Sequence, residues 1–124
     1  MPIERIFPHN SPTPRGPYSP AVRAGDFIYV SGQGPIDAVT DKLVVTSIEE
    51  QTRITLTNIQ RILAECGASM QDVVKCSVFL RDIPDFPRMN EVYKTFFGDA
   101  RPARIEVGPG GLERFERAGG SAGG

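Results

Sequence analysis

A long amphipathic segment, residues 47–66, most constrains how this chain can fold. Ser47 and Glu50 have the Ser-x-x-Glu spacing of a capping box, which satisfies backbone N–H groups at the start of a helix. Apolar side chains then recur at helical spacing: Ile48, Leu56, Ile59, Ile62, Leu63 and Cys66. Gly67 follows as a helix terminator. The sequence therefore predicts a helix over about residues 47–66, with one apolar face that must be buried.

Short segments of β-type composition lie on both sides of this helix. They are rich in β-branched and aromatic residues or alternate between apolar and polar ones. The segments are residues 2–6, 27–31, 43–45, 74–81 and 105–107. Gly25 and Asp26 form a hairpin signal in front of the second segment.

A second, shorter helix is predicted after residue 85. Asp85 can cap it, and Pro87 is tolerated in its first turn. Its apolar stripe, which is more typical of a core than of a ligand site, is Met89, Val92, Tyr93, Phe96 and Phe97. Asn90 lies just off that stripe, as either a solvated residue or a donor in a site. Helices grouped on one face of a mixed sheet fit an α+β domain.

Composition excludes several classes of function. The 124 residues suit one domain, and 40% hydrophobic and 23% charged residues are typical of a globular protein. The net charge is −1 and the basic residues are scattered, whereas nucleic-acid binders usually carry a basic surplus. Without an apolar run of transmembrane length or a leader segment, a soluble cytoplasmic protein is expected, with no membrane partner.

The sequence also lacks the residues that a metal site or a catalytic nucleophile site would need. Cys66 and Cys76 are the two cysteines, and both have the pattern of small buried residues rather than of a disulfide framework. His9 is the single histidine, in a proline-rich lead-in. A zinc site or a Ser-His triad would need partners that the sequence does not supply.

Arg104 is the candidate ligand-binding residue. Pro102 fixes an extended backbone just before it, so Arg104 is predicted to lie at the start of a strand rather than on a loose loop. A guanidinium held there presents a fork of donors suited to a carboxylate. On spacing alone, a surface arginine in a solvent-exposed ion pair is the more ordinary interpretation.

Five motifs in order change that balance, because together they resemble the RidA family, also called YjgF or L-PSP. They are Gly16-Pro17-Tyr18-Ser19-Pro20, Ile28-Tyr29-Val30-Ser31-Gly32-Gln33, Gln51-Thr52-Arg53 with Asn58-Ile59, Asn90-Glu91-Val92-Tyr93, and Arg101-Pro102-Ala103-Arg104. The resemblance covers about residues 3–107.

The resemblance implies a chorismate-mutase-like α+β fold, with two helices on one face of a mixed sheet, assembled as a homotrimer with ligand clefts between subunits. Active members hydrolyse reactive enamines and imines, such as 2-aminoacrylate, to 2-keto acids and ammonia, with neither cofactor nor metal. Arg104 matches the arginine that holds the substrate carboxylate. The residues that match the rest of the cleft are Tyr18, Ser31, Gly32 and Asn90.

The end of the chain departs from the family pattern. Active members carry a glutamate in their last strand that faces the site, where this chain has a glycine by direct count from Arg104. Glu116 is the nearest substitute, and Glu106 stands near a place where active members often carry cysteine. Residues 1–107 are thus expected to form the domain core, 108–117 a divergent final loop or strand, and 118–124 a Gly-rich disordered tail.

Two hypotheses follow. The first is a hydrolytic deaminase with Arg104 as carboxylate anchor and Glu116 as the catalytic acid; the second is the same trimer binding small carboxylates or keto acids without turnover. They differ in whether any carboxylate, Glu116 first, reaches the cleft. The ribonuclease activity also attached to this family fits worst, because basic and aromatic residues are not clustered for RNA.

Overall fold

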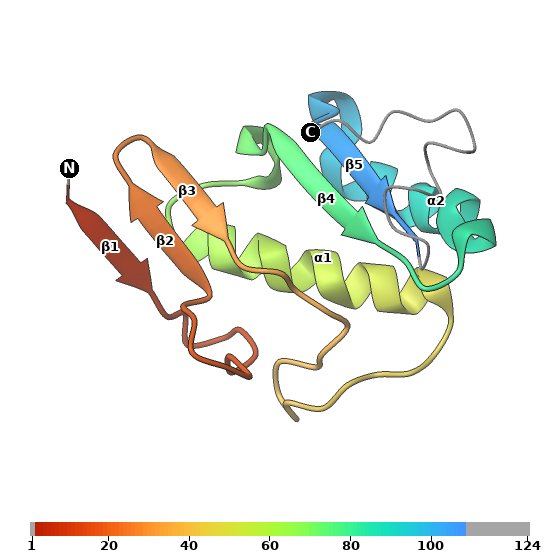
Figure 1. Ribbon diagram of the computed structural model, residues 1–124, viewed down its shortest axis with the longest axis horizontal. Helices are drawn as coiled ribbons and strands as arrows, with labels where there is room; N and C mark the ends of the chain where they lie inside the picture. The colour runs from red at the N-terminus through yellow and green to blue at the C-terminus, as the bar shows by residue number, and fades with distance from the viewer. Residues whose placement is uncertain (1, 109–124) are drawn as a thin grey trace. The chain divides into compact units, whose positions relative to one another are not determined.

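The computed structural model describes residues 2–108 of the chain, which Figure 1 draws as a coloured ribbon. The described chain divides between residues 70 and 71 into two compact units. The first unit contains strands β1 (Ile3–Ile6), β2 (Ala21–Ala24) and β3 (Phe27–Val30), followed by helix α1 (Ile48–Glu65). The second contains β4 (Lys75–Phe79), helix α2 (Phe86–Phe97) and β5 (Ala103–Val107). Short 3-10 helices are η1 (Met70–Asp72), η2 (Ile83–Asp85) and η3 (Gly98–Ala100).

Strands β1, β2 and β3 form an antiparallel sheet in that order, with β1 at one edge. The hairpin between β2 and β3 has the two-residue loop that Gly25 and Asp26 predict. Gly25 has a φ of 59°, a conformation that turns in such short hairpins require and that glycine adopts without strain. The strands predicted over residues 2–6 and 27–31 are therefore confirmed.

Helix α1 agrees with the predicted helix to within a residue at each end. Ser47 is its N-cap, and the Ser47 hydroxyl oxygen accepts a hydrogen bond of 3.2 Å from the Glu50 backbone N–H. The Glu50 carboxylate forms an ion pair of 2.8 Å with Arg53 one turn on. After the helix, Gly67 has a left-handed φ of 78°, as expected for a residue that ends a helix.

The core of the first unit lies where α1 meets one face of its sheet. Ala21, Ile62 and Cys66 are buried together, which confirms the prediction for Cys66. Side chains from the strands pack against them: Ile6, Ile28 and Val30. Because successive strand residues point to opposite faces, Phe27 and Tyr29 of β3 lie on the other face of this sheet, where both are exposed.

The prediction of a strand over residues 43–45 is wrong. Leu43 forms one isolated antiparallel bridge with Ile36, and no named strand includes residues 43–45. The side chains of Leu43 and Val45 are 61% and 80% exposed, so the β-branched composition here meets no neighbouring strand on which to pack.

In the second unit, β4 and β5 pair in parallel, with Lys75 opposite Ala103 and Phe79 opposite Val107. The connection between them runs through α2, since parallel strands need a crossover rather than a tight turn. Both predicted strands are confirmed in position. Cys76 of β4 is half-buried, so it is less enclosed than predicted.

Helix α2 is confirmed, but its predicted cap is not. Asp85 precedes the helix with φ −79° and ψ −11°, already helical values, and its side chain makes no capping hydrogen bond. Because η2 runs directly into α2, the backbone does not take the extended conformation from which an aspartate caps a helix. The Asp85 carboxylate instead lies 4.0 Å from the Arg88 guanidinium.

The α+β class is confirmed, with antiparallel pairing in the first unit and parallel pairing in the second. Within residues 2–108, no helix has both the length and the apolar character needed to cross a bilayer.

Candidate functional site

Arg104 lies on β5, directly opposite Cys76 of β4. Its guanidinium carbon is 4.8 Å from the centroid of the Tyr93 ring on α2, which is a cation–π contact. The Arg104 side chain is only 21% exposed. The strand pair and the crossover helix therefore hold this guanidinium on a rigid support.

The second partner of Arg104 is a carboxylate. Glu106 is two residues further along β5 and thus on the same face of the strand, and its Oε1 accepts a hydrogen bond from Arg104 Nη2. Glu106 is 34% exposed, so the pair is partly withdrawn from water. An ion pair at Arg104 was the ordinary expectation from spacing, but this one is half-buried rather than solvent-exposed.

Two polar atoms on α2 add to the chemistry of this region. Asn90 Oδ1 and the Tyr93 hydroxyl are buried and have no hydrogen-bond partner among the residues that the structure describes. They lie three residues apart, on neighbouring positions of one helix face. Buried polar atoms are usually paired, so an unpaired acceptor and hydroxyl are suited to a ligand, a water or another chain.

The protonation state of Tyr93 follows from its surroundings. Burial raises the pKa of the phenol, the nearby Cys76 thiol acts in the same direction, and the Arg104 guanidinium opposes both. The net effect is upward, so Tyr93 stays neutral at physiological pH and keeps its hydroxyl proton for donation.

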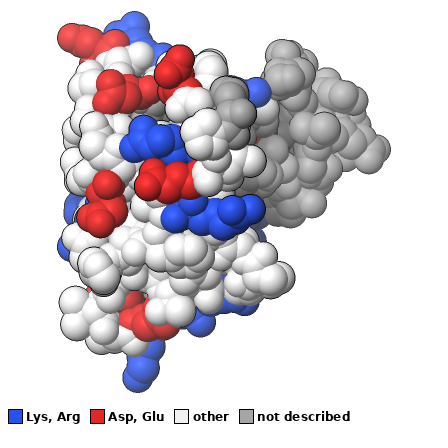
Figure 2. Space-filling model, turned by 90° about the vertical axis from the view of Figure 1, so that its left-hand side faces the viewer, with Lys and Arg blue, Asp and Glu red and all other residues white. Residues whose placement is uncertain are grey.

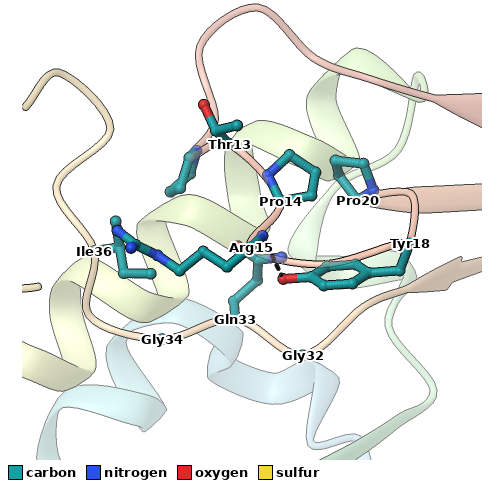
Figure 3. Close-up of a pocket in the computed structure, with 10 residues that line it drawn as sticks. Thr13, Pro14, Arg15, Tyr18, Pro20, Gly32, Gln33, Gly34 and Ile36 are labelled. Atoms are coloured by element: carbon teal, nitrogen blue, oxygen red, sulfur yellow. Dashed lines mark hydrogen bonds between the residues drawn. The ribbon is translucent and has the colours of Figure 1, made fainter. Parts of the chain in front are cut away.

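In the first unit, Tyr18 and Gly32 line a small pocket of about 30 Å³, large enough for a water-sized group (Figure 3). The Tyr18 hydroxyl oxygen accepts a hydrogen bond of 3.2 Å from the Arg15 backbone N–H, which holds the ring in place. At Gly32, a Cβ atom would meet nothing within 4 Å, so this position opens onto free space.

Ser31 joins the end of β3 to the loop that carries Tyr18. Its hydroxyl donates to the Ser19 carbonyl at 2.6 Å, and its backbone N–H donates to the Pro20 carbonyl at 2.9 Å. Both bonds fix the chain beside Tyr18, which makes Ser31 a positioning residue in this structure.

Asn58 supports the same loop from helix α1. It is 1% exposed, and its side-chain amide donates to the backbone carbonyls of Gly34, at 3.3 Å, and Ile36, at 2.8 Å. A buried amide with two such bonds fixes the glycine-rich segment after β3 to the helix.

Replacing Asn58 by alanine is expected to lower the free energy of unfolding by about 1–3 kcal/mol, because the partly buried carbonyl of Ile36 loses this donor and the carbonyl of Gly34 keeps only the Ile36 N–H. Gln60→Ala, at an exposed position of the same helix, is the matched control and should change stability little. Urea denaturation of both variants measures the difference; equal midpoints would show that Asn58 does not secure the loop.

The structure brings the predicted site residues together in two groups. Tyr18, Ser31 and Gly32 adjoin one another in the first unit. In the second, Asn90 lies one helical turn from Tyr93, which contacts Arg104. Glu116 lies outside the described residues.

Sequence reasoning missed the two direct neighbours of Arg104 as site residues. Tyr93 was assigned to the apolar stripe of its helix, and its hydroxyl gave no separate signal. Glu106 could have been found, since a residue two positions along a strand shares the face of Arg104.

Metal-ligating and charged side chains are scattered in the part of the chain that the structure describes. Within residues 2–108, no three His, Cys, Asp or Glu side chains gather so as to hold a metal ion. On the face drawn in Figure 2, acidic and basic side chains are interspersed and form no basic stripe of the kind that tracks a phosphate backbone.

Known proteins are similar to this chain over most of its length. A family model described as "Endoribonuclease L-PSP" matches residues 8–116. A RutC family protein of Pyrococcus abyssi is 50% identical over 107 residues, 86% of this chain and 84% of the relative. The 3-aminoacrylate deaminase RutC of Acinetobacter baylyi is 43% identical, with 87% of each chain covered. A 2-iminobutanoate/2-iminopropanoate deaminase of Dermatophagoides farinae is 39% identical over 86% of this chain and 84% of the relative.

Solved structures are similar over comparable lengths. RidA from an Antarctic Psychrobacter species has a TM-score of 0.80 and 36% identity, with 84% of each chain covered. Escherichia coli TdcF, crystallised with bound serine, has a TM-score of 0.79 and 33% identity, covering 85% of this chain and 84% of that one.

Proposed function

The chain belongs to the RidA (YjgF, L-PSP) family, and on this premise we propose that it hydrolyses reactive enamines and imines of the 2-aminoacrylate type to 2-keto acids and ammonia. The observation that carries the proposal is the half-buried Arg104 guanidinium, held between the Tyr93 ring and a carboxylate on the strand pair. The names of two relatives, both deaminases of small nitrogen-bearing acids, support the reaction class.

The reaction needs little beyond placement and proton transfer. A proton from solvent adds to the methylene carbon of the enamine and gives the iminium. Water adds to the electrophilic carbon of the iminium, the C=N bond breaks, a C=O bond forms, and the nitrogen leaves as ammonium. In this proposal Arg104 binds the substrate carboxylate by charge-assisted hydrogen bonds and fixes the orientation of the reacting carbon. Tyr18, Ser31, Gly32 and Asn90 are assigned to the same ligand cleft by their match to the family motifs.

The proposal also needs an acid that positions the attacking water. We assign it to Glu116, which lies beyond the described residues. The alternative, a trimer that binds small carboxylates without turnover, gains weight from the glycine found where active members carry their glutamate. A cytoplasmic location stays a prediction.

Ammonia release from freshly generated 2-aminoacrylate tests the proposal directly. We expect the protein to release ammonia and pyruvate faster than the spontaneous reaction in buffer. Calorimetric binding of pyruvate, measured in parallel, separates the hypotheses: binding without accelerated release would favour the non-catalytic protein, and neither binding nor release would contradict both.

A closed homotrimer is the expected assembly. The sheet face of the first unit that is turned away from its core carries Ile3, Phe27 and Tyr29, all exposed, and the register places Ile3, Ala24 and Phe27 in one row across the three strands. A contiguous apolar face of this kind is typical of a surface buried between subunits. The apolar face supports self-association, and the resemblance to the family implies three subunits. Light scattering at micromolar concentration should then give three times the chain mass of 13.5 kDa, and a monomeric mass would contradict the proposal.

A further inference from the structure

The reaction as proposed gives no role to Glu106, although Glu106 is the ion-pair partner of Arg104. Glu106 Oε1 accepts from Arg104 Nη2, and the two side chains are 34% and 21% exposed. Arg104, taken as a carboxylate anchor, therefore already holds a carboxylate of its own chain. Any ligand carboxylate must share the guanidinium with Glu106 or displace it.

This arrangement distinguishes ligands by their charge. A 2-keto acid brings one negative charge to a guanidinium that is already neutralised, and it meets like-charge repulsion from Glu106. An amino acid or an iminium acid brings a negative and a positive group together. Its carboxylate can bind Arg104 while its nitrogen donates to Glu106, so the ion pair of the protein is complementary to the charge pair of the ligand.

A second observation favours a ligand that donates hydrogen bonds. Asn90 Oδ1 is a buried acceptor with no partner among residues 2–108. Asn90 lies one helical turn from Tyr93, whose ring contacts the Arg104 guanidinium. An ammonium or iminium nitrogen supplies N–H donors for such an acceptor, whereas a keto oxygen supplies none.

We propose that Glu106 is a specificity-determining residue, which makes the site prefer small carboxylates that carry a cationic nitrogen over 2-keto acids of the same size. The inference rests on the proposed function in one respect only, the role of Arg104 as carboxylate anchor. It also favours product release, because the keto acid no longer balances the charge of Glu106 once the nitrogen has left as ammonium.

The test is calorimetric titration of the full chain with L-alanine and with pyruvate, which share a carbon skeleton and differ in the nitrogen. The wild type should bind L-alanine more tightly. In Glu106→Gln, pyruvate should bind about tenfold more tightly, because its repulsion from the Glu106 carboxylate is removed. L-alanine should bind about tenfold more weakly, because its ammonium loses a charged acceptor. Opposite changes in one variant cannot arise from partial unfolding.

Two further variants make the outcome decisive. Glu91→Gln removes an exposed carboxylate of α2 that is paired with Lys94, and it should leave the ratio of the two affinities unchanged. Arg104→Lys should weaken both ligands. If Arg104→Lys does so while Glu106→Gln leaves the ratio unchanged, the role of Glu106 is overturned and the anchor stands. If wild type and Arg104→Lys bind both ligands equally well, or if the wild type binds neither, the anchor and the proposed function fall as well.

Discussion

Replacement of Arg104 by alanine is expected to lower kcat/KM for ammonia release from 2-aminoacrylate by about 100-fold or more, since a misplaced reacting carbon alone can cost that factor. The variant loses the charge that binds the substrate and the cation that Tyr93 and Glu106 hold in place. The spontaneous hydrolysis rate in buffer sets the lower limit of the measurement and must be subtracted.

Controls for this variant follow from the same contacts. Alanine leaves the Glu106 carboxylate without its cation, which destabilises a partly buried group, so Arg104→Ala/Glu106→Gln should fold better yet remain slow. Arg53→Ala removes an exposed arginine paired with Glu50 on α1 and should keep the wild-type rate. A rate within a fewfold of wild type in Arg104→Ala would exclude Arg104 as the substrate anchor.

Glu116→Gln has the other large expected effect. If Glu116 positions the attacking water, glutamine preserves the shape of the side chain and removes the base, so the rate should fall by about 10²–10⁴-fold while pyruvate binding is retained. Glu113→Gln, in the same segment of the chain, is the matched control and should be neutral.

The pattern of rates distinguishes the remaining possibilities. Rapid turnover that Glu116→Gln leaves unchanged would refute Glu116 as the acid and leave the enzyme in place. No turnover in wild type or variant, with pyruvate binding intact, would favour the protein that binds without catalysis.

Local signals in the sequence were sufficient for most of the fold. The Ser47 cap and the apolar stripe that follows it define α1, and Gly25 with Asp26 defines the hairpin, because each acts through neighbours a few residues away. The prediction of a strand over residues 43–45 is wrong because a strand needs a neighbouring strand to pair with, and local composition does not supply one. The helical backbone at Asp85 likewise depends on η2 running into α2.

The candidate site was only partly predictable. The motifs predict Arg104 as a carboxylate anchor, and that role stays a prediction. Its contact with Tyr93 and its half-buried state depend on how α2 packs against β5, which periodicity does not specify. The pairing of Arg104 with Glu106 was predictable from strand alternation, because residues two apart on a strand lie on the same face. The match of Glu116 to the family acid stays a prediction.

The parallel pairing of β4 with β5 has a consequence for biosynthesis. The hairpin of β2 and β3 and the helix after them depend on contacts among residues that leave the ribosome early, and domains generally fold as units from the N-terminal side. Arg104 can meet Tyr93 and Cys76 only after the whole crossover and the last strand have been synthesised, because non-local pairing must wait for both strands. A nascent chain that stalls before residue 103 would therefore contain every residue of the first unit but not the strand that carries Arg104.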